Sequence, residues 1–160
     1  MVLQEPPDSP RRWCYGCGEA NPEGLRIEFR VEGTVAVGSF RARPLHQGFP
    51  GLVHGGITAA ALDEAMGWAM FAAGIWAVTA RMEVKYRRPL PLDEELTVRG
   101  EVTRDRGRRL EVDAQLHDAE GQLLAEATAV FMRINEERVR QLTGFYLGRT
   151  EGQSAAGETI

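Results

Sequence analysis

The feature that most constrains this chain is an apolar, alanine-rich segment that begins at His54-Gly55-Gly56. Its residues predict one long helix over positions 55–73, followed by Gly74 in the place of a helix C-cap. The only charges within it are two adjacent acids, Asp63 and Glu64. Because an unpaired buried charge costs several kcal/mol, we expect at least one of these carboxylates to have a partner or a chemical task.

Alternation of apolar and polar residues predicts strands on both sides of this helix. Two strands precede it and four follow it, with hairpin turns between the later ones. The expected strands cover residues 25–31, 34–41, 80–86, 96–103, 110–117 and 123–132. A five- to six-stranded antiparallel sheet wrapped around one long central helix is an α+β architecture.

The length of 160 residues fits one folded domain, predicted over residues 14–147, with a short helix from about residue 136. A proline-rich, extended arm is expected over residues 1–13 and a disordered tail over residues 148–160. The net charge of −4 does not suggest a nucleic-acid surface. The acids inside the apolar helix argue against a membrane span, and no signal peptide is recognised, so the sequence predicts a cytoplasmic protein.

The two cysteines, Cys14 and Cys17, are separated by two residues. A zinc ribbon requires a second pair or suitably spaced histidines, and His46, His54 and His117 do not supply that pattern. We therefore expect a turn that carries two partly buried thiols, and no metal. A redox pair and a metal site between subunits are the alternatives.

Several motifs together resemble the hotdog-fold acyl-CoA thioesterases, and in particular their PaaI-like branch. They are the run QGFPGLVHGG at residues 47–56, Asp63, YRRPLP at residues 86–91, CYGCG at residues 14–18 and NPEGL at residues 21–25. The resemblance covers most of the chain. It implies the hotdog fold, hydrolysis of an acyl-CoA thioester without metal or redox cofactor, and a homodimer, often paired into tetramers, with its sites between subunits.

The resemblance also assigns roles to residues. Asp63 corresponds to the general base or nucleophile, and the backbone N–H of Gly55 to the group that polarises the thioester carbonyl. Thr79 matches, by its spacing, a residue that holds the attacking water or nucleophile. His54 either fixes the loop or helps to orient the carbonyl. Gly48 stands where many relatives have an asparagine. At this position the chain departs from the family pattern, and the departure concerns the group that would position the carbonyl or the water.

The residues themselves support part of this assignment. A glycine amide at a helix start directs its N–H outward and lets a substrate approach closely. Asp63 and Glu64 point about 100° apart on the helix, so only one of them can serve a given carbonyl, and Glu64 is the second candidate. Simple alternation places Thr79 on the polar side of its strand with Arg81 and Glu83, which makes a solvent-facing threonine the competing interpretation.

Further residues are candidates for contact with the substrate: Gly48, Gly56, Met66, Met70, Arg87 and Arg88. For the two methionines core packing is the main alternative, and the two arginines suit the phosphates of CoA. The sequence favours an acyl-CoA thioesterase. A hotdog hydratase or dehydratase acting on enoyl thioesters, or a domain that only binds acyl-CoA, are the other functions considered.

Overall fold

The computed structural model describes residues 10–135 together with residues 137 and 138. The expected tail, the first nine residues of the expected arm and nearly all of the expected C-terminal helix lie outside these residues. At the end of the arm, Pro10–Trp13 form a 3-10 helix, η1, where the sequence predicted an extended segment. Proline explains this difference, because its fixed φ suits the first position of a helical turn.

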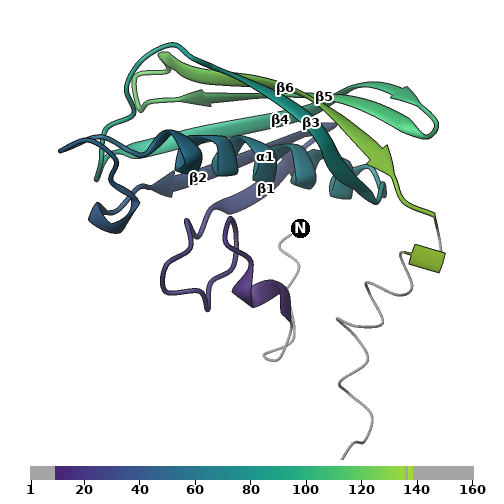
Figure 1. The fold of residues 1–160 in the computed structure, drawn as a ribbon, viewed down its shortest axis with the longest axis horizontal. Helices are drawn as coiled ribbons and strands as arrows, with labels where there is room; N and C mark the ends of the chain where they lie inside the picture. The colour runs from purple at the N-terminus through teal and green to yellow at the C-terminus, as the bar shows by residue number, and fades with distance from the viewer. Residues whose placement is uncertain (1–9, 136, 139–160) are drawn as a thin grey trace, which may run out of the picture.

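Six strands form one antiparallel sheet in the order β1-β2-β4-β5-β6-β3, which confirms the predicted architecture. Figure 1 shows the single long helix, α1, running along one face of this sheet. The elements are β1 (Glu28–Glu32), β2 (Val35–Arg41), η2 (Pro44–His46), α1 (Gly55–Ala72), β3 (Ala77–Tyr86), β4 (Glu95–Arg106), β5 (Arg109–His117) and β6 (Leu123–Arg133). Strand β3, which follows the helix, lies at one edge of the sheet.

The core lies between α1 and the inner face of the sheet. Apolar residues alternate along the strands and meet the buried face of the helix, among them Leu62, Met66, Val98 and Val112. The helix approaches β4 so closely that a Cβ on Gly100 would lie 2.3 Å from the carbonyl oxygen of Ala65. A glycine at this crossing is therefore what allows the helix to pack directly on the sheet.

The predicted end of the helix is confirmed by its hydrogen bonds. Gly74 has a φ of +69° and donates its N–H to the carbonyl of Phe71 at 3.0 Å, while Ile75 donates to Met70 at 2.9 Å. These two bonds form a Schellman motif, in which a left-handed residue closes the helix. Gly74 thus both ends α1 and directs the chain into β3.

The first strand starts later than its alternating pattern predicts. Leu25 and Ile27 are buried as expected, but β1 begins at Glu28 because Arg26 has a φ of +54° and interrupts the extended conformation. The N–H of Ile27 bonds at 2.9 Å to Gly16. We refer to residues 14–27 as the leader segment, which lies beside α1 and β1 (Figure 1).

Candidate active site

The loop before α1 is fixed by a buried histidine. His46 accepts the N–H of Arg43 on Nδ1 at 3.1 Å, and its Nε2 lies 3.0 Å from the carbonyl oxygen of Glu23. Its own carbonyl accepts the N–H of His54 at 2.9 Å. The entry to the helix is therefore tied to the leader segment through the backbone and one imidazole ring.

At the start of α1, His54 acts as the N-cap. Its Nδ1 accepts the N–H of Gly56 at 3.0 Å, so Nδ1 is unprotonated in this arrangement. Of the two roles considered for His54, this contact supports fixation of the loop. Within the part of the chain that the structure describes, the N–H of Gly55 has no acceptor, and the residue is exposed. One backbone donor at the positive end of the helix is thus available to a ligand.

Tyr86 is a neighbour of this helix start that the sequence did not single out. Its hydroxyl donates to the carbonyl of Gly55 at 2.9 Å, and its ring lies 3.6 Å from the place of a Gly55 Cβ. The only sequence signal was its position at the head of the run at residues 86–91. The hydrogen bond fixes the peptide between Gly55 and Gly56 against the edge strand and holds the first turn of α1 in place.

The middle of the helix carries a contact between a carboxylate and a hydroxyl. The Thr79 hydroxyl donates to Oδ1 of Asp63 at 2.7 Å, joining α1 to β3. Asp63 is half-buried and Thr79 is exposed. The distance is that of a strong hydrogen bond between a hydroxyl and a carboxylate.

The expectation that Thr79 shares a face with Arg81 is wrong, because β3 contains a bulge. Thr79 pairs with Phe131 and Arg81 with the preceding residue, Val130, so Ala80 has no partner on β6. One extra residue reverses the alternation. Thr79 therefore lies on the same side as buried Phe131 and faces the helix.

Comparisons with known proteins agree with this arrangement. The family model described as "Thioesterase superfamily" matches residues 50–125, which include the Gly55, Asp63 and Thr79 positions. A crystal structure of a thioesterase superfamily protein superposes with a TM-score of 0.72 at 29% identity, covering 76% of this chain and 60% of the other. The chain has the hotdog fold of these thioesterases.

Further thioesterase and PaaI proteins are similar over shorter or more distant matches. Acyl-coenzyme A thioesterase THEM4 of Mus musculus is 34% identical over 93 residues, 58% of this chain and 40% of that protein. The bovine protein of the same name is 31% identical over 100 residues, 62% and 41% of the two chains. This chain thus matches about two fifths of the length of these curated relatives. The Escherichia coli PaaI structure has the same fold, with a TM-score of 0.65 at 20% identity over 69% of this chain and 81% of that one.

Gly55 and Asp63 of one chain are too far apart to serve one carbonyl. Eight residues of helix separate them by about 12 Å along the axis. An oxygen bound to the Gly55 N–H lies about 3 Å farther out, because helix N–H groups point toward the N-terminus. The aspartate side chain tilts back by about the same amount. The remaining gap of about 12 Å exceeds the reach of a base that acts directly or through one water.

Glu64, the neighbouring acid, points in another direction and meets the leader segment. Its carboxylate accepts from the Cys14 thiol at 3.5 and 3.6 Å. Both cysteines are free and half-buried, in agreement with the predicted turn. The hydrogen bond with the Cys17 thiol lowers the pKa of Cys14 to about 5, and the same bond, together with burial, raises the pKa of Cys17.

Gly48 lies directly against the helix entry. A Cβ at this position would be 2.9 Å from Cα of His54 and 3.3 Å from its Cβ. Any residue with a Cβ, the expected asparagine included, requires a different path of this loop. The glycine is therefore a structural requirement of the loop in this chain.

The other candidate residues for substrate contact lie in different surroundings. Met66 and Met70 are buried in the core, which gives them a packing role within one chain. Arg87 forms an ion pair with Glu126 at 2.5 Å, whereas Arg88 is exposed and its backbone N–H bonds to Leu124. Contact of these side chains with a substrate stays a prediction.

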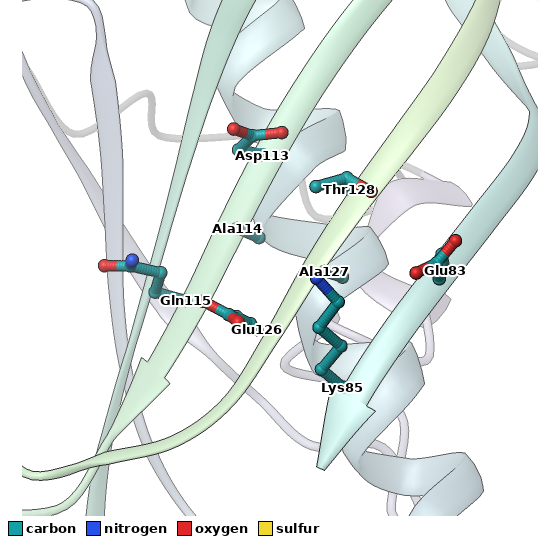
Figure 2. A pocket seen from close by; sticks show the side chains of 8 residues that line it. All are labelled: Glu83, Lys85, Asp113, Ala114, Gln115, Glu126, Ala127 and Thr128. Atoms are coloured by element: carbon teal, nitrogen blue, oxygen red, sulfur yellow. The ribbon is translucent and has the colours of Figure 1, made fainter. Parts of the chain in front are cut away.

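A hollow of about 140 Å³ lies on the outer face of the sheet, away from α1. Figure 2 shows its lining on β3, β5 and β6, where Glu83, Lys85, Asp113 and Glu126 project from neighbouring strands. Asp113 has a raised pKa, caused first by burial and then by the surrounding glutamates. Like charges gathered on a strand surface are typical of a solvated face, so we assign no chemistry to this hollow.

No helix in the described part of the chain combines the length and the apolar character that crossing a membrane requires.

Proposed function

We propose that this chain is an acyl-CoA thioesterase, which hydrolyses an acyl-CoA thioester to the free acid and CoA. The observation that carries the proposal is the 2.7 Å hydrogen bond between Thr79 and Asp63 at the interface of α1 and the edge strand. A carboxylate held in one orientation by a hydroxyl is suited to act on water or on a carbonyl carbon. The available N–H of Gly55 supplies the complementary donor for the carbonyl oxygen.

In the proposed reaction, Asp63 takes a proton from water as the water oxygen attacks the thioester carbon, or attacks this carbon itself. Thr79 donates to Oδ1 and leaves Oδ2 to face the reacting group. The carbonyl oxygen gains negative charge, which the N–H of Gly55 and the positive end of α1 stabilise. Collapse of the tetrahedral intermediate breaks the carbon–sulfur bond and releases the CoA thiolate, which is then protonated. When Asp63 is the nucleophile, water then hydrolyses the acyl–Asp63 anhydride, which releases the free acid and restores the carboxylate.

We further propose that the active site combines two copies of the chain. The gap between the Gly55 donor and Asp63 within one chain calls for a second chain, which brings its helix start to the first chain's carboxylate. Strand β3 offers the matching surface, because it is an edge strand on which Val78 is 50% and Tyr86 55% exposed. Pairing of two β3 edges around a two-fold axis would bury both residues and join the sheets. The proposal includes the pairing of two such dimers into a tetramer.

Solved structures of the same fold support the substrate class. A hypothetical thioesterase protein from Streptococcus pneumoniae was crystallised with coenzyme A, and smu.793 from Streptococcus mutans with acetyl CoA. The pneumococcal protein was also crystallised as a threonine-to-alanine and as an aspartate-to-alanine mutant. The two mutated positions are separated by the same 16 positions as Asp63 and Thr79.

For CoA itself, we propose contacts near the helix entry. Gly56 and Gly48 leave the backbone accessible there, and both are exposed. Arg88 is a better candidate for the phosphates than Arg87, because Arg87 is already paired with Glu126. A pocket for the acyl group beside Met66 and Met70 requires movement of core side chains.

A cytoplasmic location stays a prediction of the sequence.

Release of free thiol from acyl-CoA substrates of different length tests the activity. We expect Asp63→Asn to lower kcat by a factor of about 10² to 10⁴, the usual contribution of a general base, with an unchanged circular dichroism spectrum. Full activity of Asp63→Asn would end the proposal. An assay of enoyl-CoA hydration, run in parallel, separates a thioesterase from a hydratase, and binding of acyl-CoA without release of thiol would identify a binding domain.

A further inference from the structure

The leader segment holds its two cysteines on one tight turn. The N–H of Gly18 bonds to the carbonyl of Cys14 at 2.9 Å, and a Cβ on Gly18 would lie 2.5 Å from the backbone N and O of Cys14. Only glycine fits this turn without a shift of the backbone. The N–H of Ile27 bonds to Gly16 at 2.9 Å and anchors the turn at the start of β1. The positions of Cys14 and Cys17 are therefore set by the backbone.

A third side chain reaches this turn from the middle of α1, 50 positions along the chain. Glu64 lies over the turn so closely that a Cβ on Gly16 would be 2.4 Å from its carboxyl carbon. Its two oxygens are 3.5 and 3.6 Å from Sγ of Cys14. The two cysteine Sγ atoms and one carboxylate oxygen of Glu64 all lie within 4.8 Å of one another. All three residues are half-buried.

We propose that Cys14, Cys17 and Glu64 form a binding site for Zn²⁺, with water as the fourth ligand. Thiolate sulfur and carboxylate oxygen both bind zinc, at about 2.3 and 2.0–2.2 Å, and pairs of cysteines two residues apart are common in zinc sites. At the tetrahedral angle these bond lengths separate a sulfur from an oxygen ligand by about 3.5 Å. The distance between Sγ of Cys14 and Oε2 of Glu64 is 3.5 Å.

The donor set favours a cation over a redox-active pair. A redox pair needs only the two sulfurs, whereas a third ligand from Glu64 completes a donor set for a divalent cation. Here the group in contact with the thiol is a carboxylate, which a divalent cation would bind together with the sulfurs. Asp63 lies about 100° away on the helix and faces Thr79, so the zinc site is separate from the proposed hydrolytic site. Its effect is to fasten the leader segment to α1.

The test uses the full chain, stripped with a chelator under reducing conditions and then titrated with Zn²⁺ or Co²⁺. We expect one zinc per chain by mass spectrometry of the metal, and sulfur-to-cobalt charge-transfer bands with Co²⁺. Cys14→Ser and Cys17→Ser should each abolish these bands. Glu64→Gln should weaken zinc binding at least 10-fold, since even outer-sphere changes cost 10- to 100-fold. Glu23→Gln, in the same leader segment, is the control that should bind like the parent chain.

Several results would overturn the inference. Zinc content in the parent chain no higher than in the Cys14→Ser/Cys17→Ser double variant would show that there is no site. A disulfide between the two cysteines in protein kept under reductant would establish the redox alternative. Unchanged zinc affinity of Glu64→Gln would remove the carboxylate from the site. None of these measurements depends on hydrolysis, so the zinc site and the thioesterase proposal can fail independently.

Discussion

The proposed division of the active site between two chains can be tested by complementation. One variant, Asp63→Asn, removes the carboxylate function. A second, Gly55→Pro, removes the N–H donor, because proline has none. Proline is favoured at the first helical position, and the preceding residue, His54, already has the ψ of 138° that a following proline requires. Gly55→Ala is the matched control, since it keeps the N–H and its Cβ would meet only an ordinary contact at 3.6 Å from Tyr86.

The expected magnitudes follow from the geometry. Loss of one oxyanion donor costs about 10² to 10³ in kcat, and loss of the base about 10² to 10⁴, so each variant alone should retain about 1% or less. If each site takes Gly55 from one chain and Asp63 from the other, a mixed dimer of the two variants contains one intact site. Its activity per dimer should be about half that of the parent, which is about 50-fold above either variant alone.

The assay requires two affinity tags, so that only the mixed dimer is purified before thiol release is measured. A second mixed dimer gives the opposite result. When the parent chain is paired with the double variant Gly55→Pro/Asp63→Asn, both shared sites carry one defect and activity should be about 1%. If that dimer instead retains half of the activity and the first is inactive, each site lies within one chain and the reasoning from the helix length is refuted.

Four further predictions concern single contacts. Thr79→Val should lower kcat/KM about 10- to 150-fold, because a hydrogen bond to a charged group contributes about 1.5–3 kcal/mol. The controls Thr79→Ser and Thr128→Val, the latter on the outer face of the sheet, should keep kcat/KM near the parent value. Val78→Asp should abolish the proposed dimer and give monomers by light scattering, while Val31→Asp, 46% exposed on the opposite edge strand, should not. Gly100→Ala should destabilise the chain by about 1–3 kcal/mol in denaturant melts, since its Cβ meets the helix backbone, and Gly67→Ala, which meets nothing within 4 Å, should not. The pKa of Asp113 is raised in the folded state, so ionisation of this carboxyl destabilises the folded chain as the pH rises. Asp113→Asn should therefore raise Tm at pH 7. Below the usual aspartate pKa of about 3.9, the variant and the parent chain should have the same Tm.

The architecture could be predicted because its signals are local. Alternation along the strands, the apolar run of α1 and the glycine that ends it each depend on neighbouring residues. The predicted start of the first strand, at residue 25, is three residues too early, and the cause is also local. Arg26 adopts a left-handed conformation, which the alternating pattern does not reveal, and the leader segment takes up the hydrogen bonds there.

The face of β3 on which Thr79 lies could not be predicted from alternation, although the resemblance pointed to this residue, since the face depends on which residue of β6 lies opposite. A bulge shifts the register by one and reverses the side of every residue before it. The sequence around Ala80 contains no glycine to mark this position. Bulges often occur beside active sites because they redirect a side chain, and here the bulge turns a threonine from solvent toward a carboxylate.

The two adjacent acids of α1 illustrate how a single helix can connect separate functions. Successive residues point about 100° apart, so Asp63 and Glu64 cannot share a partner. Asp63 meets Thr79 on β3, whereas Glu64 meets Cys14 in the leader segment. A charge in an apolar helix has to be compensated, and each of these acids is compensated by a different part of the chain. It follows that Glu64→Gln should alter zinc binding and the stability of the leader segment, while Asp63→Asn should alter hydrolysis; a variant that exchanged these effects would contradict both assignments.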